Sequence, residues 1–128
     1  DRPVGWRTLE LPYGLGAGIR KSLGNASVVV IDCLTLLVSN LVCREGGVGG
    51  VVNRVRREID SLLECIDSVP AAFIIVSNEV GLGLVPENKL GRLYRDLLGE
   101  VNRLMAGRAD EVLLMVAGIP VKVKSRKG

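Results

Sequence analysis

Three short apolar runs divide the chain and predict the strands of a β-sheet. They are VVVI at residues 28–31, FIIV at residues 73–76 and VLLMV at residues 112–116. None of them alternates with polar residues, which is typical of parallel strands that are buried on both faces. A looser alternation at residues 6–11, and another in IPVKVK at residues 119–124, predicts edge strands.

Longer stretches with apolar residues at helical spacing lie between these runs. Residues 34–42 predict a short apolar helix, and residues 52–66 predict an amphipathic helix that ends before Pro70. Asn88 is placed to cap a third helix, whose apolar face from Leu90 to Met105 is expected to belong to the core. Strands that alternate with helices are typical of right-handed crossovers. We therefore expect the three apolar runs to lie parallel in one sheet of an α/β fold.

Two glycine-rich stretches interrupt this pattern. YGLGAG at residues 13–18 contains a GxGxG string, but no buried strand leads into it and no acidic residue follows at the distance that a dinucleotide site requires. We therefore expect a loop there. GGVGG at residues 46–50 lacks the Lys-Ser/Thr pair of a phosphate-binding loop and is expected to be a surface loop.

The bulk composition is that of one folded domain spanning residues 1–128. Apolar residues make up 48% of the chain and aromatic residues 3%, so the core must be aliphatic. No apolar stretch approaches the ~18 residues of a membrane span, and no signal peptide is recognisable. Three cysteines without a CxxC pair indicate a reduced, cytoplasmic protein with buried thiols.

The charged and titratable residues exclude several kinds of site. The net charge is +3, and much of the excess lies in Lys122, Lys124, Arg126 and Lys127. We expect these residues to form a solvated terminus rather than a nucleic-acid contact, because few aromatic residues are present to stack on bases. The 128 residues contain no histidine, which excludes a histidine-based triad or metal site within them.

Polar residues follow two of the predicted strands at their carboxyl ends, where parallel sheets bind their ligands. Asp32 ends the first run, and Asn78 and Glu79 follow the second in VSNEVGLGLVPEN. An apolar run that ends in Asp is typical of a Walker B strand, whose carboxylate holds Mg²⁺ directly or through water beside the phosphates of a nucleotide. The same residue could instead cap the next helix. The turn after Asn78 and Glu79 could likewise be purely structural, since it contains Gly81 and Gly83.

Four segments carry a resemblance to a known family. They are DRPVGWRTLE, VVVIDCLTLLVSNLV, VSNEVGLGLVPENKLGRLYRDLLGEVNRLMAGRADEV and VAGIPVKVK, which follow one another from the first residue to Lys124. Together they resemble the adenosylcobinamide kinase/adenosylcobinamide-phosphate guanylyltransferase family of cobalamin biosynthesis. The resemblance implies a P-loop, RecA-like three-layer fold with a mainly parallel sheet, assembled as a homotrimer.

The resemblance also implies substrates and roles for individual residues. The family phosphorylates adenosylcobinamide with ATP or GTP, and then transfers GMP from GTP to adenosylcobinamide phosphate through a guanylylated histidine, with Mg²⁺ as cofactor. By this resemblance Asp1, Arg2, Glu10 and Asp32 are nucleotide-binding residues, and Asp32 also contacts the metal. Asn78 and Glu79 are placed for the corrinoid or for a neighbouring subunit.

The family pattern is incomplete in residues 1–128. The family's first strand, its GxRSGKS-type phosphate loop and its histidine are not among them, so no catalytic nucleophile is assigned within these residues. We expect the sequence to be the C-terminal majority of the domain. An inactive remnant that binds a corrinoid or pairs with other subunits is the alternative, and an unrelated kinase of another small alcohol is a third.

Overall fold

The computed structural model describes residues 2–44 and 48–126. By their internal contacts the described residues divide between Val76 and Ser77 into two compact units. The fold is mixed α/β with a parallel sheet, as expected. That the chain forms a single domain stays a prediction.

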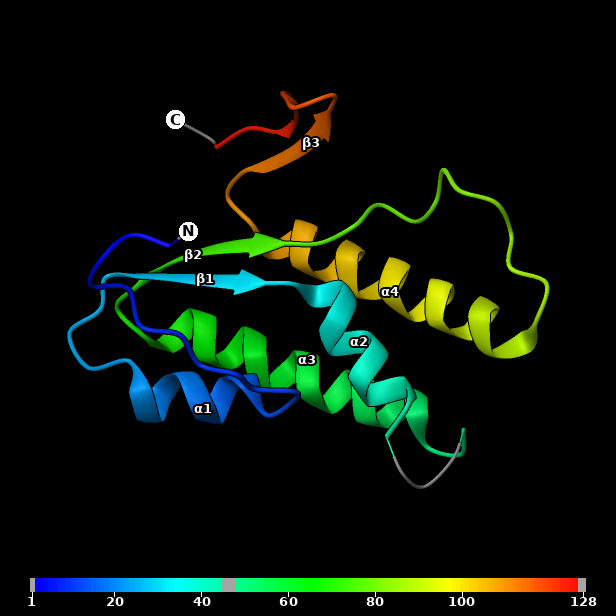
Figure 1. Cartoon of the computed structure of the whole chain (residues 1–128), viewed down its shortest axis with the longest axis horizontal. Coiled ribbons are helices and arrows are strands. Elements are labelled where there is room, and N and C mark those ends of the chain that lie inside the picture. The colour runs from blue at the N-terminus through cyan, green and yellow to red at the C-terminus, as the bar shows by residue number, and fades with distance from the viewer. Residues whose placement is uncertain (1, 45–47, 127–128) are drawn as a thin grey trace. The chain divides into compact units, whose positions relative to one another are not determined.

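The first unit contains a parallel pair of strands, β1 (Val28–Asp32) and β2 (Ala72–Val76). Their register places Ile31 opposite Ile75 and Asp32 opposite Val76, so the carboxyl ends of both strands coincide. The parallel pairing of the first two apolar runs is therefore confirmed. Figure 1 shows helices α1 (Leu15–Ser22) and α3 (Val51–Ser68) on one side of these strands.

Helices α2 (Leu34–Val42) and α3 supply most of the core of this unit. Their apolar residues recur at helical spacing, which places them on one side of each helix. The fully buried side chains include Leu34, Val38, Val51, Leu62 and Cys65. Both helices were predicted from this spacing, and α3 ends at Ser68, shortly before Pro70.

Helix α1 contradicts the predicted loop at residues 13–18. Gly14 precedes the helix with a positive φ of 72°, and Gly16 and Gly18 lie within it. A Cβ atom on Gly16 would lie 2.8 Å from the backbone oxygen of Ser61 in α3. The glycine therefore lets α1 and α3 approach closely, and the backbone amide of Leu15 donates to Glu58 Oε1 at 3.0 Å. The glycine-rich stretch at residues 13–18 therefore serves the packing of α1 on α3.

The edge strand predicted at residues 6–11 is also wrong, because this segment pairs with no strand among the described residues. The Arg7 guanidinium donates to the Leu23 carbonyl at 2.9 Å, and Leu11 lies over Gly18. These contacts fix the segment beside α1 instead. The expected buried thiols are confirmed only for Cys65, since Cys33 is half-buried and Cys43 is exposed.

The second unit contains α4 (Lys89–Arg108), β3 (Val112–Val116) and β4 (Ile119–Lys124). As predicted, Asn88 caps α4, and its side chain accepts from the Gly91 amide at 2.6 Å. Only part of the predicted apolar face of α4 is buried: Leu97, Leu98, Val101 and Met105 lie in the core, whereas Leu90 is exposed.

The expected position of residues 112–116 in the parallel sheet is corrected by the structure. Among the described residues, β3 pairs with β4 alone, and the pairing is antiparallel. The two strands are joined by Ala117 and Gly118, both with positive φ, so a tight turn brings neighbouring segments together. The edge strand predicted at residues 119–124 is confirmed as β4.

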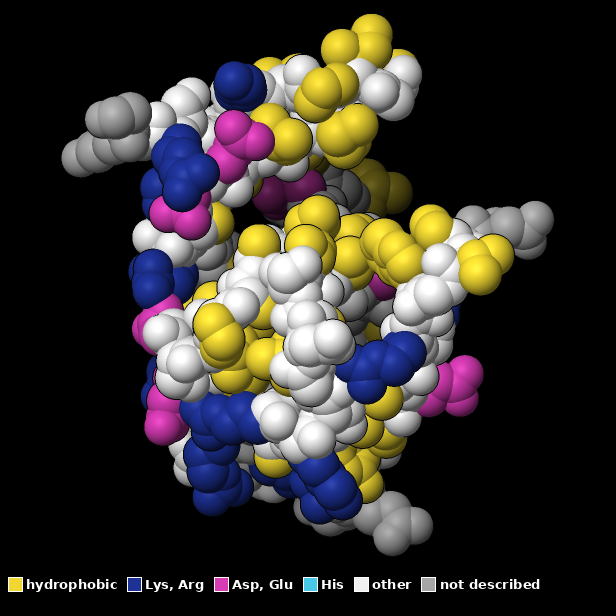
Figure 2. Space-filling view, turned by 90° about the vertical axis from the view of Figure 1, so that its left-hand side faces the viewer, with side chains coloured by type: hydrophobic (Ala, Val, Ile, Leu, Met, Phe, Trp, Pro, Cys, Tyr) yellow, Lys and Arg dark blue, Asp and Glu magenta, His cyan; other side chains and the backbone are white. Residues whose placement is uncertain are grey.

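The β3–β4 hairpin keeps large apolar side chains in solvent. Met115, Ile119 and Val123 are each at least 58% exposed. Figure 2 shows hydrophobic side chains gathered at the surface of this part of the chain. Lys124, expected in a solvated terminus, instead donates to the carbonyls of Ala106 and Gly107 at 2.9 and 3.0 Å. Across the part of the chain that the structure describes, no helix is long and apolar enough to cross a lipid bilayer.

Candidate functional site

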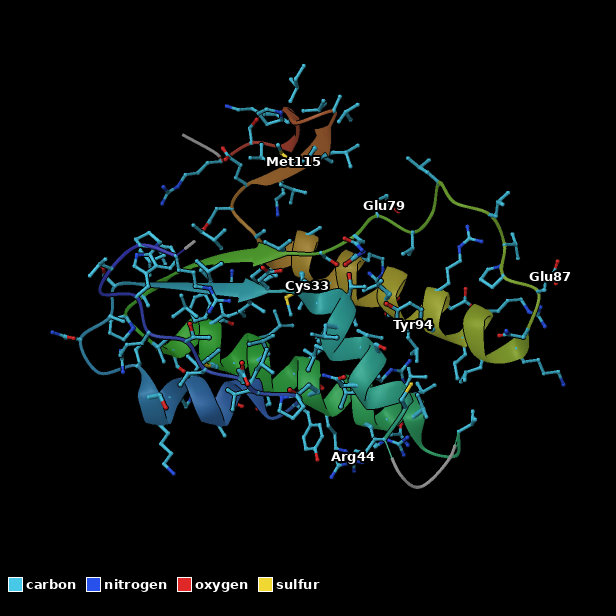
Figure 3. The ribbon with its side chains drawn as sticks, in the orientation of Figure 1. Cys33, Arg44, Glu79, Glu87, Tyr94 and Met115 are labelled. Carbon is cyan, nitrogen blue, oxygen red and sulfur yellow. The ribbon has the colours of Figure 1, made fainter. Side chains whose placement is uncertain are left out.

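Asp32 is the last residue of β1 and is exposed. In this strand Val28, Val30 and Asp32 face solvent, while Ile31 is buried on the other face. The apolar run therefore anchors the strand through one face and carries the carboxylate to its end. Figure 3 shows the neighbouring Cys33 directly after the strand, at the start of α2. The peptide bond between Asp32 and Cys33 is cis.

The structure decides against one alternative role of Asp32. The residue in the N-cap position of α2 is Cys33, in extended conformation, and no side-chain capping hydrogen bond is formed. Asp32 belongs to the strand and does not cap the helix. A strand-end carboxylate without a capping role is available to a ligand.

The donor set near Asp32 determines what kind of metal site it fits. Within residues 2–44 and 48–126 there is no group of three or more His, Cys, Asp or Glu side chains that could hold a metal ion. Mg²⁺ is commonly held by one or two carboxylates together with waters and the phosphates of a substrate. A single exposed carboxylate therefore fits Mg²⁺ bound as a nucleotide complex, and it does not fit a metal held by protein ligands alone.

Arg2 and Glu10 lie on the exposed segment that precedes α1. The chain turns at Pro3, whose carbonyl accepts from the Trp6 amide at 3.3 Å, and the Arg2 guanidinium donates to the Thr8 hydroxyl. Arg2 is thus folded back over its own segment, and Glu10 is open to solvent. Asp1, the third residue assigned to this segment, lies outside the described residues.

Asn78 and Glu79 belong to the second unit, at the start of the segment that leads to α4. The Asn78 carbonyl accepts from the Asn102 side chain at 2.8 Å, and Ser77 Oγ donates to Asn102 Oδ1 at 2.5 Å. One carboxylate oxygen of Glu79 accepts from the Gly81 amide at 2.7 Å. Both residues are exposed, and these contacts give them a structural role in the turn. Their role in ligand binding stays a prediction.

The structure reveals two anchoring residues that sequence reasoning missed. Arg95 donates to the carbonyls of Val80 and Gly81, and Arg92 donates to those of Pro86 and Glu87. Arg92, Arg95 and Asn102 recur at intervals of three and seven residues, which places them on one stripe of α4. The signal in the sequence that could have identified these anchoring residues is the polar stripe on a helix that follows a glycine-rich segment.

A hollow in the first unit lies away from Asp32. It is lined by Tyr13, Asn40, Cys43 and Arg44, at the opposite end of α2 from Asp32. The Arg44 guanidinium stacks over the Tyr13 ring at 4.5 Å, and the Asn40 side chain donates to the Pro12 carbonyl at 3.1 Å. These contacts join the end of α2 to the segment before α1, which is a structural role.

A parallel strand pair packed on helices, with an exposed carboxylate at its carboxyl end, defines the class of the first unit. Such α/β units bind ligands outside the carboxyl ends of their strands.

Comparisons with known proteins give the family. Residues 1–123 match the family described as cobinamide kinase / cobinamide phosphate guanyltransferase. The chain is 38% identical over 131 residues to the bifunctional adenosylcobalamin biosynthesis protein CobU of Salmonella typhimurium, covering 96% of this chain and 72% of that protein. Identity and coverage are the same for the Escherichia coli protein of that name. The bifunctional adenosylcobalamin biosynthesis protein CobP of Pseudomonas aeruginosa is 39% identical over 123 residues, covering 96% of this chain and 68% of that protein.

The chain therefore belongs to the cobinamide kinase / cobinamide phosphate guanyltransferase family, a family of enzymes. The resemblance identified from the four sequence segments is confirmed.

Proposed function

We propose that this protein is a bifunctional adenosylcobinamide kinase and adenosylcobinamide-phosphate guanylyltransferase. In the first reaction a substrate hydroxyl oxygen attacks the γ-phosphorus of ATP or GTP, and the nucleoside diphosphate leaves. In the second, GMP passes from GTP to the new phosphate and pyrophosphate leaves. The products are adenosylcobinamide phosphate and then adenosylcobinamide-GDP.

The observation that carries the proposal is Asp32 in a chain of this family. Its carboxylate is exposed at the carboxyl end of a parallel strand and does not cap α2. In the proposed site Asp32 holds Mg²⁺, directly or through water, beside the nucleotide phosphates. The metal supplies charge that stabilises those phosphates. Arg2 and Glu10, together with Asp1, contact the nucleotide from the preceding segment.

The exposed apolar face of the strand pair supports a three-layer fold of the P-loop type. Val28, Val30, Ile74 and Val76 are each at least 40% exposed on β1 and β2. Parallel sheets are ordinarily covered on both faces, so a strand pair with one open apolar face is typical of a three-layer fold in which a further layer lies on that face. We propose that the intact domain has the RecA-like fold and assembles as a homotrimer.

The test is Asp32→Asn in protein expressed from the complete coding sequence. An amide cannot supply the charge that the metal requires, so kinase and guanylyl-transfer rates with Mg²⁺ should fall ~10²–10³-fold while the fold is kept. Asp60→Asn, at an exposed position of α3, is the matched control and should retain both rates. Unchanged rates in Asp32→Asn would exclude the assigned role.

A second candidate function is a module that binds a corrinoid or pairs with other subunits without catalysis. The observation that favours it is compositional: residues 1–128 contain neither a histidine nor a Gly-Lys-Ser sequence. The rates of the native protein in the same assay distinguish the two functions. The module would bind cobinamide but would show no turnover of nucleotide.

A further inference from the structure

The Asn102 side chain of α4 bonds both residues that directly follow β2. Asn102 Oδ1 accepts from Ser77 Oγ at 2.5 Å, and Asn102 Nδ2 donates to the Asn78 carbonyl at 2.8 Å. A carbonyl oxygen can only accept, so the amino end of the Asn102 amide must face Asn78 and its oxygen must face the Ser77 hydroxyl. The two contacts therefore hold the chain after β2 in one arrangement against α4.

The backbone is also held a few residues further along. Arg95 donates to the carbonyls of Val80 and Gly81 at 3.1 and 3.3 Å, and the Gly81 amide donates to Glu79 Oε1 at 2.7 Å. Asn102 thus fixes the peptide bond that precedes Glu79, and Gly81 fixes the Glu79 carboxylate. Figure 3 shows Glu79 on the segment between β2 and α4. Its side chain is exposed, so the carboxylate is held in place and is still open to solvent.

The identity of residue 102 is matched to these hydrogen bonds rather than to burial. Asn102 is half-buried, next to the buried Val101 and one helical turn from the buried Leu98 and Met105. Leucine at this position would have a higher helix propensity and would add apolar surface to the core. Leucine forms no side-chain hydrogen bond, and aspartate of the same size can only accept. The asparagine amide accepts from one neighbour and donates to the next.

The place of these contacts in the chain connects them with ligand binding. Residues 77–79 follow the carboxyl end of a parallel strand, where α/β units bind their ligands. A carboxylate can accept about four hydrogen bonds, so the bond from Gly81 leaves Glu79 able to accept from hydroxyl or N–H groups of a ligand. A side chain that is already held loses less conformational entropy on binding than a mobile one.

We propose that Asn102 is a positioning residue, which fixes the Asn78–Glu79 peptide so that the Glu79 carboxylate contacts the bound substrate. This inference rests on the proposed function and adds to it the residue that orients the contacting group. Asn102 acts through Glu79 and does not itself touch the substrate.

The experiment compares kinetics with stability in protein expressed from the complete coding sequence. In the kinase reaction, kcat/KM is measured for adenosylcobinamide and for GTP. Asn102→Asp keeps the size of the side chain and the acceptor for Ser77 but removes the donor to the Asn78 carbonyl. It should lower kcat/KM for at least one of the two substrates about 10- to 100-fold, because the contacting group is misplaced. Asn53→Asp, at an exposed position of α3, is the matched control and should keep the native kcat/KM values.

A second variant separates positioning from stability. Asn102→Leu removes both hydrogen bonds and should lower kcat/KM at least as much as Asn102→Asp does. Its midpoint of urea denaturation should stay at or above the native value, because leucine favours the helix and adds apolar surface to the core. A purely structural role would instead lower the midpoint and leave kcat/KM unchanged.

A double variant tests whether Asn102 acts through Glu79. Glu79→Gln removes the charge, but the amide oxygen can still accept from the Gly81 amide, so the turn is kept. This variant should lower kcat/KM for the same substrate as Asn102→Asp. Because both substitutions disturb one contact, the double variant should be no slower than the slower single variant.

Two results would overturn the positioning role and leave the proposed function intact. One is a native kcat/KM for both substrates in Asn102→Asp. The other is a double variant in which the two losses multiply, since Asn102 would then act independently of Glu79. A native protein that catalyses neither reaction would overturn the proposed function itself, before any variant is compared.

Discussion

Replacing Gly16 with alanine tests whether the glycine string of residues 13–18 serves helix packing. Gly16 is buried in α1, and a Cβ atom there would lie 2.7 Å from Ser61 Oγ and 2.8 Å from the Ser61 backbone oxygen. The hydroxyl can rotate away, but the carbonyl belongs to the middle of α3 and cannot. The methyl group is therefore accommodated only if the two helices move apart.

The expected magnitude follows from two opposing effects. Gly to Ala in a helix interior stabilises by ~1 kcal/mol through helix propensity. Overpacking a tight contact costs ~1–3 kcal/mol, and contact with backbone places this case in the upper part of that range. We expect Gly16→Ala to lower the free energy of unfolding by ~1–2 kcal/mol.

The measurement is urea denaturation followed by far-UV circular dichroism. Ala17→Gly, at the neighbouring exposed position, isolates the propensity effect in the same helix and should cost ~1 kcal/mol. Gly99→Ala, where an added Cβ meets nothing within 4 Å, should stabilise α4. If Gly16→Ala also proved stabilising, the close approach of α1 and α3 would be refuted.

Three further predictions concern the hydrogen bonds of Lys124, the buried thiol of Cys65 and the absence of histidine from residues 1–128. Lys124→Met removes the ammonium that bonds the carbonyls of Ala106 and Gly107, and it should cost ~1–2 kcal/mol in the same denaturation measurement, whereas the exposed Lys122→Met should cost almost nothing. Burial raises the pKa of the Cys65 thiol above its ordinary value of 9.0, so its contribution to stability is complete below that pH and is lost as the pH rises above it. The free energy of unfolding should therefore fall less between pH 8 and 10.5 in Cys65→Ala than in the native chain, once the pH-independent packing loss is subtracted. An equal fall in both proteins would contradict the raised pKa of Cys65. Purified residues 1–128, which contain no histidine, should take up no acid-labile GMP from labelled GTP, and a covalent adduct would show that the nucleophile is misplaced.

Local sequence determined the strands and helices whose apolar residues recur at a regular spacing. The apolar runs at residues 28–31 and 73–76 became β1 and β2, and helical spacing located α2, α3 and α4. Asn88 was recognised as a cap because its side chain bonds an amide only three residues away. For the helices and the cap the decisive contacts lie within the element, and the parallel pairing of β1 with β2 followed from the alternation of strands with helices.

The candidate site likewise has features that the sequence specified and features that only the structure revealed. That Asp32 ends a strand could be read from VVVID, because the run and the carboxylate are adjacent. That it does not cap α2 required the backbone conformation of Cys33. The anchoring roles of Arg92 and Arg95 join residues up to 15 positions apart, and nothing in the local pattern specifies which carbonyls an arginine will meet.

Tertiary structure alone decided the features that depend on distant partners. The string at residues 13–18 has the composition of a loop, yet Gly14 and Gly16 serve a helix that packs on Ser61 and is bonded by Glu58, both more than forty residues away. The run at residues 112–116 has the composition of a parallel strand, yet it pairs antiparallel with β4 across a two-residue turn. Composition reports how deeply a segment prefers to be buried. Its partner and direction are chosen by backbone hydrogen bonds and close contacts that form only when the chain has folded.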